Sequence, residues 1–225
     1  MNRYLRLGSG LAALALLLTG CGELAANRPA LDALSNVAGR IAGTGRPAVS
    51  AASTDPRRVL TRQMIDQSGA PVILVVVTER DAAATLVRAG ENRDKITWVS
   101  ADGIGIVLRD GVLIGTRGLG DDLMGADVKG SQSALRRGGT ATRIHDYLTG
   151  TDQVVRRRFQ CSFASAGTEH IDIIQKVHAT TRIDETCSDA TTSFINSYWI
   201  GTDGTTWKSR QWVSSIVGSL EIYRL

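Results

Sequence analysis

The spacing of hydrophobic positions changes near residue 70. Before that point, Asp55 and Pro56 are typical of a helix start and Gly69 is typical of a helix end, which predicts one helix of about three turns within residues 53–69. After it, residues 71–78 (PVILVVVT) form a continuous run of mostly branched apolar side chains. Such a run is typical of a strand that is buried on both faces.

A tight hairpin is predicted in the middle of the chain. Residues 103–118 (GIGIVLRDGVLIGTRG) contain two apolar runs that meet at Asp110 and Gly111. This pair readily adopts the positive φ angles of a two-residue turn, so the two runs should be paired strands. The residues that follow, 118–139, are rich in glycine, serine and aspartate and indicate loops.

The last third of the chain has the pattern of further strands. Within residues 169–184, for example, Ile171 and Ile173 alternate with His170 and Asp172, which is typical of a strand with one buried face. Other strand segments are predicted at residues 153–167, 192–204, 205–215 and 219–225. We therefore expect a mainly β protein, a large antiparallel β-sandwich or flattened barrel, with a few short helices near its N-terminal side.

The first twenty residues are typical of a secretory signal peptide. Arg3 and Arg6 supply a basic start, and Leu11–Leu18 supply an apolar core that is too short to cross a bilayer as a helix. The sequence LTGC at residues 18–21 resembles the lipobox of bacterial lipoproteins, with leucine three positions before the cysteine and small residues between them. The alternative is an ordinary secretory signal that happens to contain a cysteine.

The lipobox resemblance implies cleavage before Cys21 and acylation of both its sulfur and the new amino terminus. Several acyl chains hold a protein stably at a membrane, whereas one chain binds only marginally. Gly22 in place of aspartate after the cysteine implies delivery to the outer membrane, with the protein facing the periplasm. The chain would then consist of a signal peptide at residues 1–20, an acylated flexible tether at 21–52 and a single β-rich periplasmic domain at 53–225.

The charge balance gives no case for nucleic-acid binding. The full chain carries 26 basic and 22 acidic side chains. Removal of residues 1–20 takes away Arg3 and Arg6, which leaves 24 basic against 22 acidic side chains and a formal charge of +2. This small excess lacks the strong basic character that attracts nucleic acid.

Two cysteines, Cys161 and Cys187, lie in the body of the chain. An exported protein folds in an oxidising compartment, where two thiols tend to form a disulfide. The alternatives are two free buried thiols or part of a metal site, for which the usual short Cys-x-x-Cys spacing is absent. We expect a structural disulfide, and neither a cofactor nor a metal.

Two stretches carry a family resemblance. They are ITWVSADGIGIVLRDGVLIGTRGLGDDLMGA at residues 96–126 and SYWIGTDGTTWKSRQWV at residues 197–213. Together with the lipobox, these turn and aromatic placements resemble the capsule-polysaccharide lipoprotein family labelled GfcB/YjbF, over roughly residues 58–225. The resemblance implies a β-rich outer-membrane lipoprotein encoded with machinery that makes or exports an extracellular polysaccharide, and it implies no particular reaction.

Two charged clusters have structural as well as functional interpretations. Asp121, Asp122 and Asp127 lie among glycines, but they lack the spacing of an EF-hand calcium loop. A solvated turn that uses aspartate for local hydrogen bonds is favoured over a metal site. Residues 156–158 are three consecutive arginines, which we interpret as a solvated strand edge in preference to a site for anionic groups.

Histidine side chains could serve as metal ligands or as general bases. On one regular strand, His170 and His178 would lie about 27 Å apart, too far to share an ion. Only His170 with Asp172 could then cooperate locally, and exposed strand residues are the favoured interpretation. The serines lie in no Gly-x-Ser-x-Gly elbow. The sequence therefore predicts no catalytic residue.

The aromatic residues are concentrated late in the chain. Apart from Tyr4 and Trp98, every Trp, Tyr and Phe lies at or beyond Tyr147. Sugar rings stack on exposed aromatic rings, which makes Trp199, Trp207 and Trp212 candidates for contact with carbohydrate. The favoured alternative is that they form the core of the C-terminal sheet. Because Trp207 and Trp212 are an odd number of residues apart, a regular strand would place them on opposite faces.

Three functions are compatible with these patterns. The first is a non-enzymatic accessory in capsule or exopolysaccharide production or secretion, held to the membrane by its lipid anchor and in contact with polysaccharide or export-machinery proteins. The second is a polysaccharide-modifying enzyme, a lyase or hydrolase, which for hydrolysis needs two carboxylates about 5 to 9.5 Å apart. The third is a structural envelope lipoprotein unrelated to polysaccharide. We expect the first.

Overall fold

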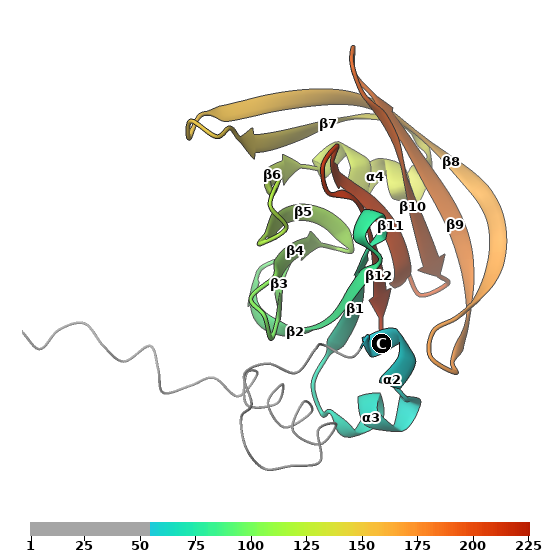
Figure 1. Cartoon of the computed structure of the whole chain (residues 1–225). Coiled ribbons are helices and arrows are strands. Elements are labelled where there is room, and N and C mark those ends of the chain that lie inside the picture. Colours follow the sequence, from blue (N-terminus) through green and yellow to red (C-terminus); the bar gives the residue numbers. More distant parts are fainter. Residues whose placement is uncertain (1–54) are drawn as a thin grey trace, which may run out of the picture.

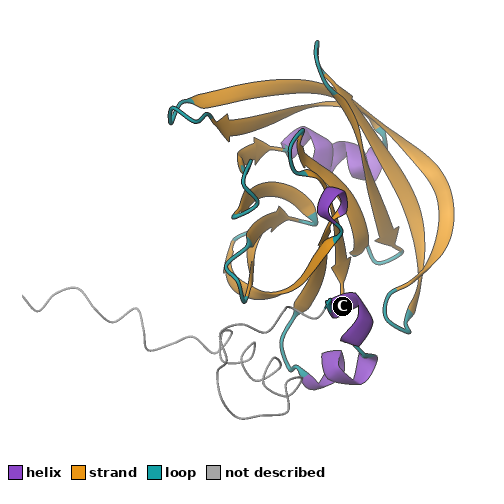
Figure 2. Ribbon diagram, in the orientation of Figure 1, coloured by secondary structure: helices purple, strands orange, loops and turns teal. Residues whose placement is uncertain are grey.

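The computed structural model describes residues 55–225, and strands dominate them (Figures 1 and 2). The helices are α2 (Pro56–Val59), α3 (Arg62–Gln67), the 3-10 turn η1 (Thr78–Arg80) and α4 (Lys129–Arg137). The strands are β1 (Val72–Val77), β2 (Ala82–Asn92), β3 (Lys95–Ser100), β4 (Gly105–Arg109), β5 (Val112–Arg117), β6 (Leu123–Asp127), β7 (Gly139–Leu148), β8 (Val154–Asp172), β9 (Val177–Ser188), β10 (Ser193–Gly201), β11 (Thr206–Ser214) and β12 (Gly218–Arg224). The signal peptide, Cys21 and the tether lie outside the described residues.

All twelve strands belong to one antiparallel sheet that curves into a nearly closed barrel (Figure 1). The order is β5-β4-β3-β2-β1-β12-β11-β10-β9-β8-β7-β6, so the first and last strands of the chain pair at its centre. The two edge strands, β5 and β6, lie close together: a Cβ at Gly115 would be 3.6 Å from the backbone oxygen of Leu123. The expectation of a mainly β, antiparallel, barrel-like fold is confirmed.

The barrel interior is packed with apolar side chains from alternate positions of the strands. Its aromatic centre contains Trp212, whose ring stacks on Phe194 with the centroids 4.4 Å apart. Phe159 meets both rings edge-on. Helix α4 packs against β7 and β8 on the concave side of the sheet (Figure 1). The interior is therefore a core, closed at one side by a helix.

The early strand predictions are confirmed. Five of the six residues of β1 are buried, as its continuous apolar run indicates. The predicted hairpin consists of β4 and β5, and its turn has Asp110 at φ 48° and Gly111 at φ 82°. Two successive positive φ angles are what a two-residue turn matched to the strand twist requires.

The prediction of one helix in residues 53–69 is wrong. Asp55 does cap a helix, because its side chain accepts a hydrogen bond from the Arg57 N–H at 2.9 Å. The helix ends at Leu60, which is extended, and Thr61 caps α3 by accepting from the Met64 N–H. A second N-cap residue in the middle of the segment thus divides it into two short helices.

Residues 169–184 form a hairpin and not a single strand. The turn between β8 and β9 has Ile174 and Gln175 at positive φ angles of 47° and 64°. It brings His178 opposite Ile171 on the neighbouring strand, so the separation of about 27 Å expected for His170 and His178 on one strand is wrong. The loops expected at 118–139 contain β6 and α4.

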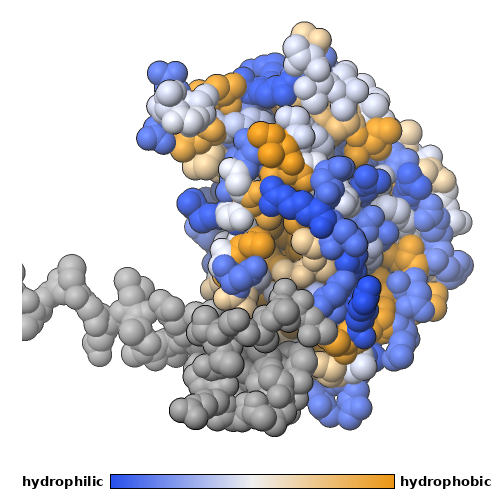
Figure 3. Space-filling model, in the orientation of Figure 1, coloured by the Kyte–Doolittle hydropathy of each residue, from blue (hydrophilic) through white to orange (hydrophobic). Residues whose placement is uncertain are grey.

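Among the described residues, no helix is long and apolar enough to cross a membrane. The exposed large hydrophobic side chains are Met124, Leu148, Val154, Val155, Val177, Ile195 and Ile216. Leu148 and Val154 face each other where β7 turns into β8. On the face drawn in Figure 3, hydrophobic atoms are visible near this hairpin tip on a surface that is otherwise mixed or hydrophilic.

Candidate functional site

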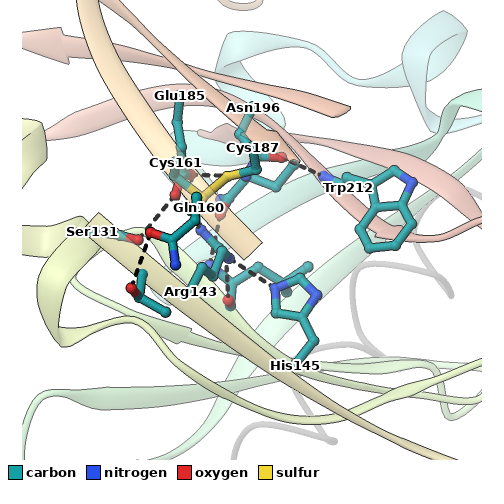
Figure 4. Close-up of a disulfide and its surroundings, with 12 residues drawn as sticks. Ser131, Arg143, His145, Gln160, Cys161, Glu185, Cys187, Asn196 and Trp212 are labelled. Carbon is teal, nitrogen blue, oxygen red and sulfur yellow. Dashed lines mark hydrogen bonds and ion pairs between the residues drawn. A yellow bond between two sulfur atoms is a disulfide. The ribbon is translucent and has the colours of Figure 1, made fainter. Parts of the chain in front are cut away.

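A buried ion pair lies beside the disulfide inside the barrel (Figure 4). Arg143 on β7 and Glu185 on β9 are both fully buried, and Nη1 of Arg143 lies 2.9 Å from Oε2 of Glu185. Two charges can be accommodated in a core only when their remaining hydrogen-bonding groups are also satisfied. The surrounding residues supply these partners from four elements, α4, β5, β7 and β10.

The Glu185 carboxylate accepts hydrogen bonds from four side chains. Besides Arg143, it accepts from the Ser131 hydroxyl of α4 at 2.9 Å, the Asn196 side-chain amide of β10 at 2.8 Å and the Tyr198 hydroxyl at 2.8 Å. Asn196 in turn accepts from the backbone N–H of Trp212. The carboxylate therefore joins α4, β7, β9 and β10 at one point.

The network also satisfies the backbone of the edge strand β5. Nη2 of Arg143 donates to the Leu113 carbonyl at 3.0 Å, and Oε1 of Gln211 accepts from the Leu113 N–H at 2.7 Å. Nε2 of Gln211 donates to the Gly111 carbonyl at 2.8 Å. Side chains thus take the place of a neighbouring strand, which is one way to protect a sheet edge.

His145 continues the network away from the ion pair. Nε of Arg143 donates to Nε2 of His145 at 2.8 Å, so the neutral ring carries its proton on Nδ1. Nδ1 then donates to the Tyr147 hydroxyl at 2.9 Å, and that hydroxyl donates to the Val213 carbonyl at 2.5 Å. β7 points inward at every second position, and three of these positions are Arg143, His145 and Tyr147.

Burial and neighbouring charges explain the pKa values in this network. Burial raises the pKa of Glu185, but the Arg143 charge and the three hydrogen bonds outweigh it, so the pKa lies below its ordinary value. Burial alone would lower the pKa of Arg143, and the Glu185 carboxylate reverses this. Burial raises the pKa of Tyr198 well above its ordinary value. At neutral pH the ion pair is therefore charged and the tyrosine is neutral.

The pKa of His145 is well below 6.5, first because the ring is buried and second because Arg143 and Arg157 are positive. The unfolded chain takes up this proton near pH 6.5, whereas the folded protein resists it. We therefore expect the free energy of unfolding to fall between pH 7 and pH 5, by up to about 1.4 kcal/mol per pH unit.

Urea titrations at pH 5, 6 and 7 measure this decrease. His145→Gln keeps an acceptor for Arg143 and removes the titrating ring, so it should flatten the pH dependence. His178 also has a lowered pKa, mainly through burial, so the double variant with His178→Gln should lose most of the slope that remains between pH 7 and pH 6. An unchanged slope in His145→Gln would contradict the assignment.

The predicted disulfide between Cys161 and Cys187 is present, and it links directly opposed residues of β8 and β9. Glu185 lies close enough to both sulfur atoms that the three residues form a cluster of metal-ligand type. The sulfur atoms are bonded to each other, so they are not thiolates, and the carboxylate is engaged by Arg143. This cluster is structural.

The three candidate tryptophans are in different environments. Trp212 is 9% exposed and lies in the aromatic core. Trp199 lies on the outer face, where Lys208 and Arg182 cover its ring and Glu169 accepts its indole N–H at 2.6 Å. Trp207 is partly exposed and packs against His178, with the ring centroids 3.8 Å apart. Trp207 and Trp212 thus lie on opposite faces.

The charged clusters are engaged in local structure. The Asp122 carboxylate accepts hydrogen bonds from the Thr116 hydroxyl and the backbone N–H groups of Gly118 and Leu119. Asp127 accepts from the Lys129 N–H at the start of α4. The interpretation of residues 156–158 as a sheet edge is wrong, because β8 lies between β7 and β9.

A cavity of about 530 Å³ lies where the β2–β3, β4–β5 and β10–β11 turns meet the end of α4. We call it the mouth cavity. Its buried wall is mostly apolar, with Ile73, Trp98, Leu108 and Ile222, and it also includes Ser209. Its outer residues include four arginines and four carboxylates: Arg88, Arg93, Arg136, Arg224, Glu91, Asp94, Asp110 and Asp203. Charged side chains thus surround an aromatic ring in this cavity.

The carboxylates of the mouth cavity are already engaged. Arg109 donates to Asp94 at 2.5 Å, and this hydrogen bond lowers the pKa of Asp94. The backbone N–H and the hydroxyl of Thr205 donate to Asp203, at 2.9 and 2.8 Å, and lower its pKa as well. Glu91 pairs with Arg88, and Asp110 accepts from the Gln132 amide at 2.9 Å. Both shifted carboxylates are held in the ionised form.

Sequence reasoning did not identify the buried network or the mouth cavity. One available signal was position: Glu185 is two residues before Cys187, so both lie on the same face of β9. The mouth cavity combines residues from three turns that are distant in the sequence. No local pattern could have brought these turns together.

Comparison with known proteins gives a family and a fold. The family model described as group 4 capsule polysaccharide lipoprotein gfcB, YjbF matches residues 44–225. No curated protein matches the chain. Among solved structures, the chain is similar to the hypothetical lipoprotein YmcC from Escherichia coli (K12), with 18% sequence identity and a TM-score of 0.63. That match covers 78% of this chain and 96% of the other. At this identity, the likeness shows the fold.

Proposed function

Because the chain belongs to the GfcB/YjbF family of group 4 capsule polysaccharide lipoproteins, we propose that it is a non-enzymatic accessory in producing or secreting an extracellular polysaccharide. In this proposal it is anchored in the outer membrane through Cys21 and faces the periplasm. The LTGC sequence at residues 18–21 and Gly22 support this anchoring. Its partners would be the polysaccharide and proteins of the export machinery.

The state of the carboxylates in the mouth cavity carries the non-enzymatic part of the proposal. A glycoside hydrolase needs a carboxylic acid whose pKa is raised, so that it can protonate the leaving oxygen. Asp94 and Asp203 have pKa values shifted in the opposite direction, because each accepts hydrogen bonds in its ionised form. Glu185 also has a lowered pKa, and it is fully buried in the structural network. These groups support binding and architecture better than proton transfer.

A polysaccharide-modifying enzyme is the alternative, and a structural envelope lipoprotein unrelated to polysaccharide is a further one. A glycan contact through an outer tryptophan stays a prediction for Trp207, which combines an outer position with partial exposure. The rings of Trp199 and Trp212 are 8% and 9% exposed. Stacking of a sugar on either ring would require neighbouring side chains to move.

We expect Cys21→Ala to abolish lipidation and most polysaccharide secretion, because the protein would lose its attachment to the membrane. Labelling with a palmitate analogue measures lipidation, and secreted polysaccharide is measured in a strain that carries only the variant. Asp94→Asn and Asp203→Asn are the matched controls, and each should leave secretion near normal. A stable, lipidated Asp94→Asn or Asp203→Asn protein that secretes nothing would favour an enzyme instead.

A further inference from the structure

We propose that the mouth cavity binds a negatively charged segment of a glycan chain. This inference relies on the proposed function for the choice of a glycan, and the cavity itself supplies the preference for negative charge. Three guanidinium groups at its opening, those of Arg93, Arg136 and Arg224, make no side-chain hydrogen bond or ion pair with another described residue. All three residues are exposed. The free hydrogen-bonding capacity of the opening is therefore cationic.

The carboxylates do not cancel this capacity, because they have partners. Glu91 and Asp94 pair with arginines, Asp110 accepts from Gln132, and Asp203 accepts from Thr205. The lining contains equal numbers of arginines and carboxylates, four of each. Because the carboxylates already have partners, the groups left without hydrogen-bond partners among the described residues are mainly guanidinium donors. Guanidinium groups bind carboxylate and phosphate groups through charge-assisted hydrogen bonds, often in pairs.

The wall of the cavity beneath these guanidinium groups is largely apolar. It includes Trp98, which is 7% exposed, and the neighbouring side chains of Ile73 and Ile222. A sugar offers an apolar C–H face to such a wall and acceptor oxygens to the arginines at the opening.

Two other hollows share lining residues with the mouth cavity. A hollow of about 340 Å³ shares Asp110, Arg136 and Thr206 with the mouth cavity. Another, of about 580 Å³, shares Arg93 and Asp94 and adds Lys95 and Arg109. Each of the three hollows has at least one arginine in its lining. This arrangement fits a polymer better than a single small anion.

The test is isothermal titration calorimetry of the full lipidated protein in a non-ionic detergent. The probes are a hexamer of galacturonic acid, its fully methyl-esterified form and inorganic phosphate. The ester keeps the sugar backbone and removes the charge. We expect the hexamer to bind at least about tenfold more tightly than the ester, because hydrogen bonds to charged groups contribute that much or more. Equal affinities would overturn the proposal, and so would phosphate that displaces the hexamer at similar concentration.

Two sets of variants locate the site. The triple variant Arg93→Gln, Arg136→Gln and Arg224→Gln should weaken hexamer binding by about tenfold or more. The matched triple variant Arg58→Gln, Arg117→Gln and Arg158→Gln changes the net charge equally at exposed residues outside the cavity, and it should bind as the wild type does. Thermal unfolding confirms that each variant is folded. An equal loss in both triple variants would show non-specific attraction and overturn the site.

The binding assay and the secretion assay test the two proposals independently. If the hexamer does not bind while Cys21→Ala still abolishes secretion, the mouth cavity is not a site for acidic glycans and the accessory function stands. If the hexamer binds as expected while secretion is independent of Cys21, the lipid-anchored accessory function is wrong and the site remains.

Discussion

Replacing Glu185 by glutamine should lower the free energy of unfolding by about 3 to 5 kcal/mol, although the side chain keeps its size. The charge of Arg143 would remain fully buried without its counter-ion. In addition, four groups donate hydrogen bonds to the carboxylate, and the glutamine amide would place its own donor against one of them. Both effects act in the folded state.

Asp184→Asn is the matched control, because it makes the same change one residue earlier on the opposite face of β9. Asp184 also accepts hydrogen bonds, from Arg182 at 2.9 Å and Ser197 at 2.6 Å, but it is partly exposed. Its loss should cost less than about 1 kcal/mol. Urea titrations of the full chain, followed by tryptophan fluorescence, measure both changes. A decrease for Glu185→Gln as small as that for Asp184→Asn would contradict the structural role of the network.

The strands that could be predicted from the sequence are those with a strong local signal. β1 is a run of branched apolar residues, and the β4–β5 hairpin has Asp110 and Gly111 at its turn. The pairing of β1 with β12 had no such signal, because the two strands lie at opposite ends of the described chain. The choice between a sandwich and a barrel depends on that pairing. Alternation along one strand shows which residues share a face but not which strands are neighbours.

The same limit explains the misplaced histidines. Residues 169–184 alternate well enough to suggest one strand, and Ile174 and Gln175 are not typical turn residues. Both nevertheless adopt positive φ angles at the β8–β9 turn, where Gln175 N–H donates to the Asp172 carboxylate. Aspartate before a turn was a weak signal that such a bond could form. The alternation of apolar and polar residues therefore continues through the turn, which is why it suggests one strand where the structure has two.

Part of the buried network around Arg143 and Glu185 could be predicted from the alternation of side chains along β9. Once the disulfide places Cys187 inward, the alternation places Glu185 inward as well, and a buried carboxylate needs a cation. The sequence offers many arginines, and only the folded barrel, in which β8 separates β7 from β9, shows that Arg143 is the one that reaches it. The mouth cavity is harder still, since its three unpaired arginines come from a turn, a helix end and the last strand.

Removal of the disulfide by the double substitution Cys161→Ala and Cys187→Ala should lower the free energy of unfolding by about 3 to 4 kcal/mol. The two cysteines are 26 residues apart, and a cross-link over a loop of this length removes conformational freedom from the unfolded chain. The effect arises in the unfolded state, so the unfolded double variant should expose more surface. The dependence of the unfolding free energy on urea concentration should therefore be steeper in the variant.

The wild-type protein unfolded with a reducing agent provides the control, because it loses the cross-link without losing the sulfur atoms from the core. Cys161 and Cys187 are 2% and 0% exposed, so the folded protein should resist the reductant. Once unfolded and reduced, it should refold with a stability within about 1 kcal/mol of the double variant, the difference being the small cavities left by alanine. A double variant as stable as the oxidised protein would contradict a stabilising role for the disulfide between β8 and β9.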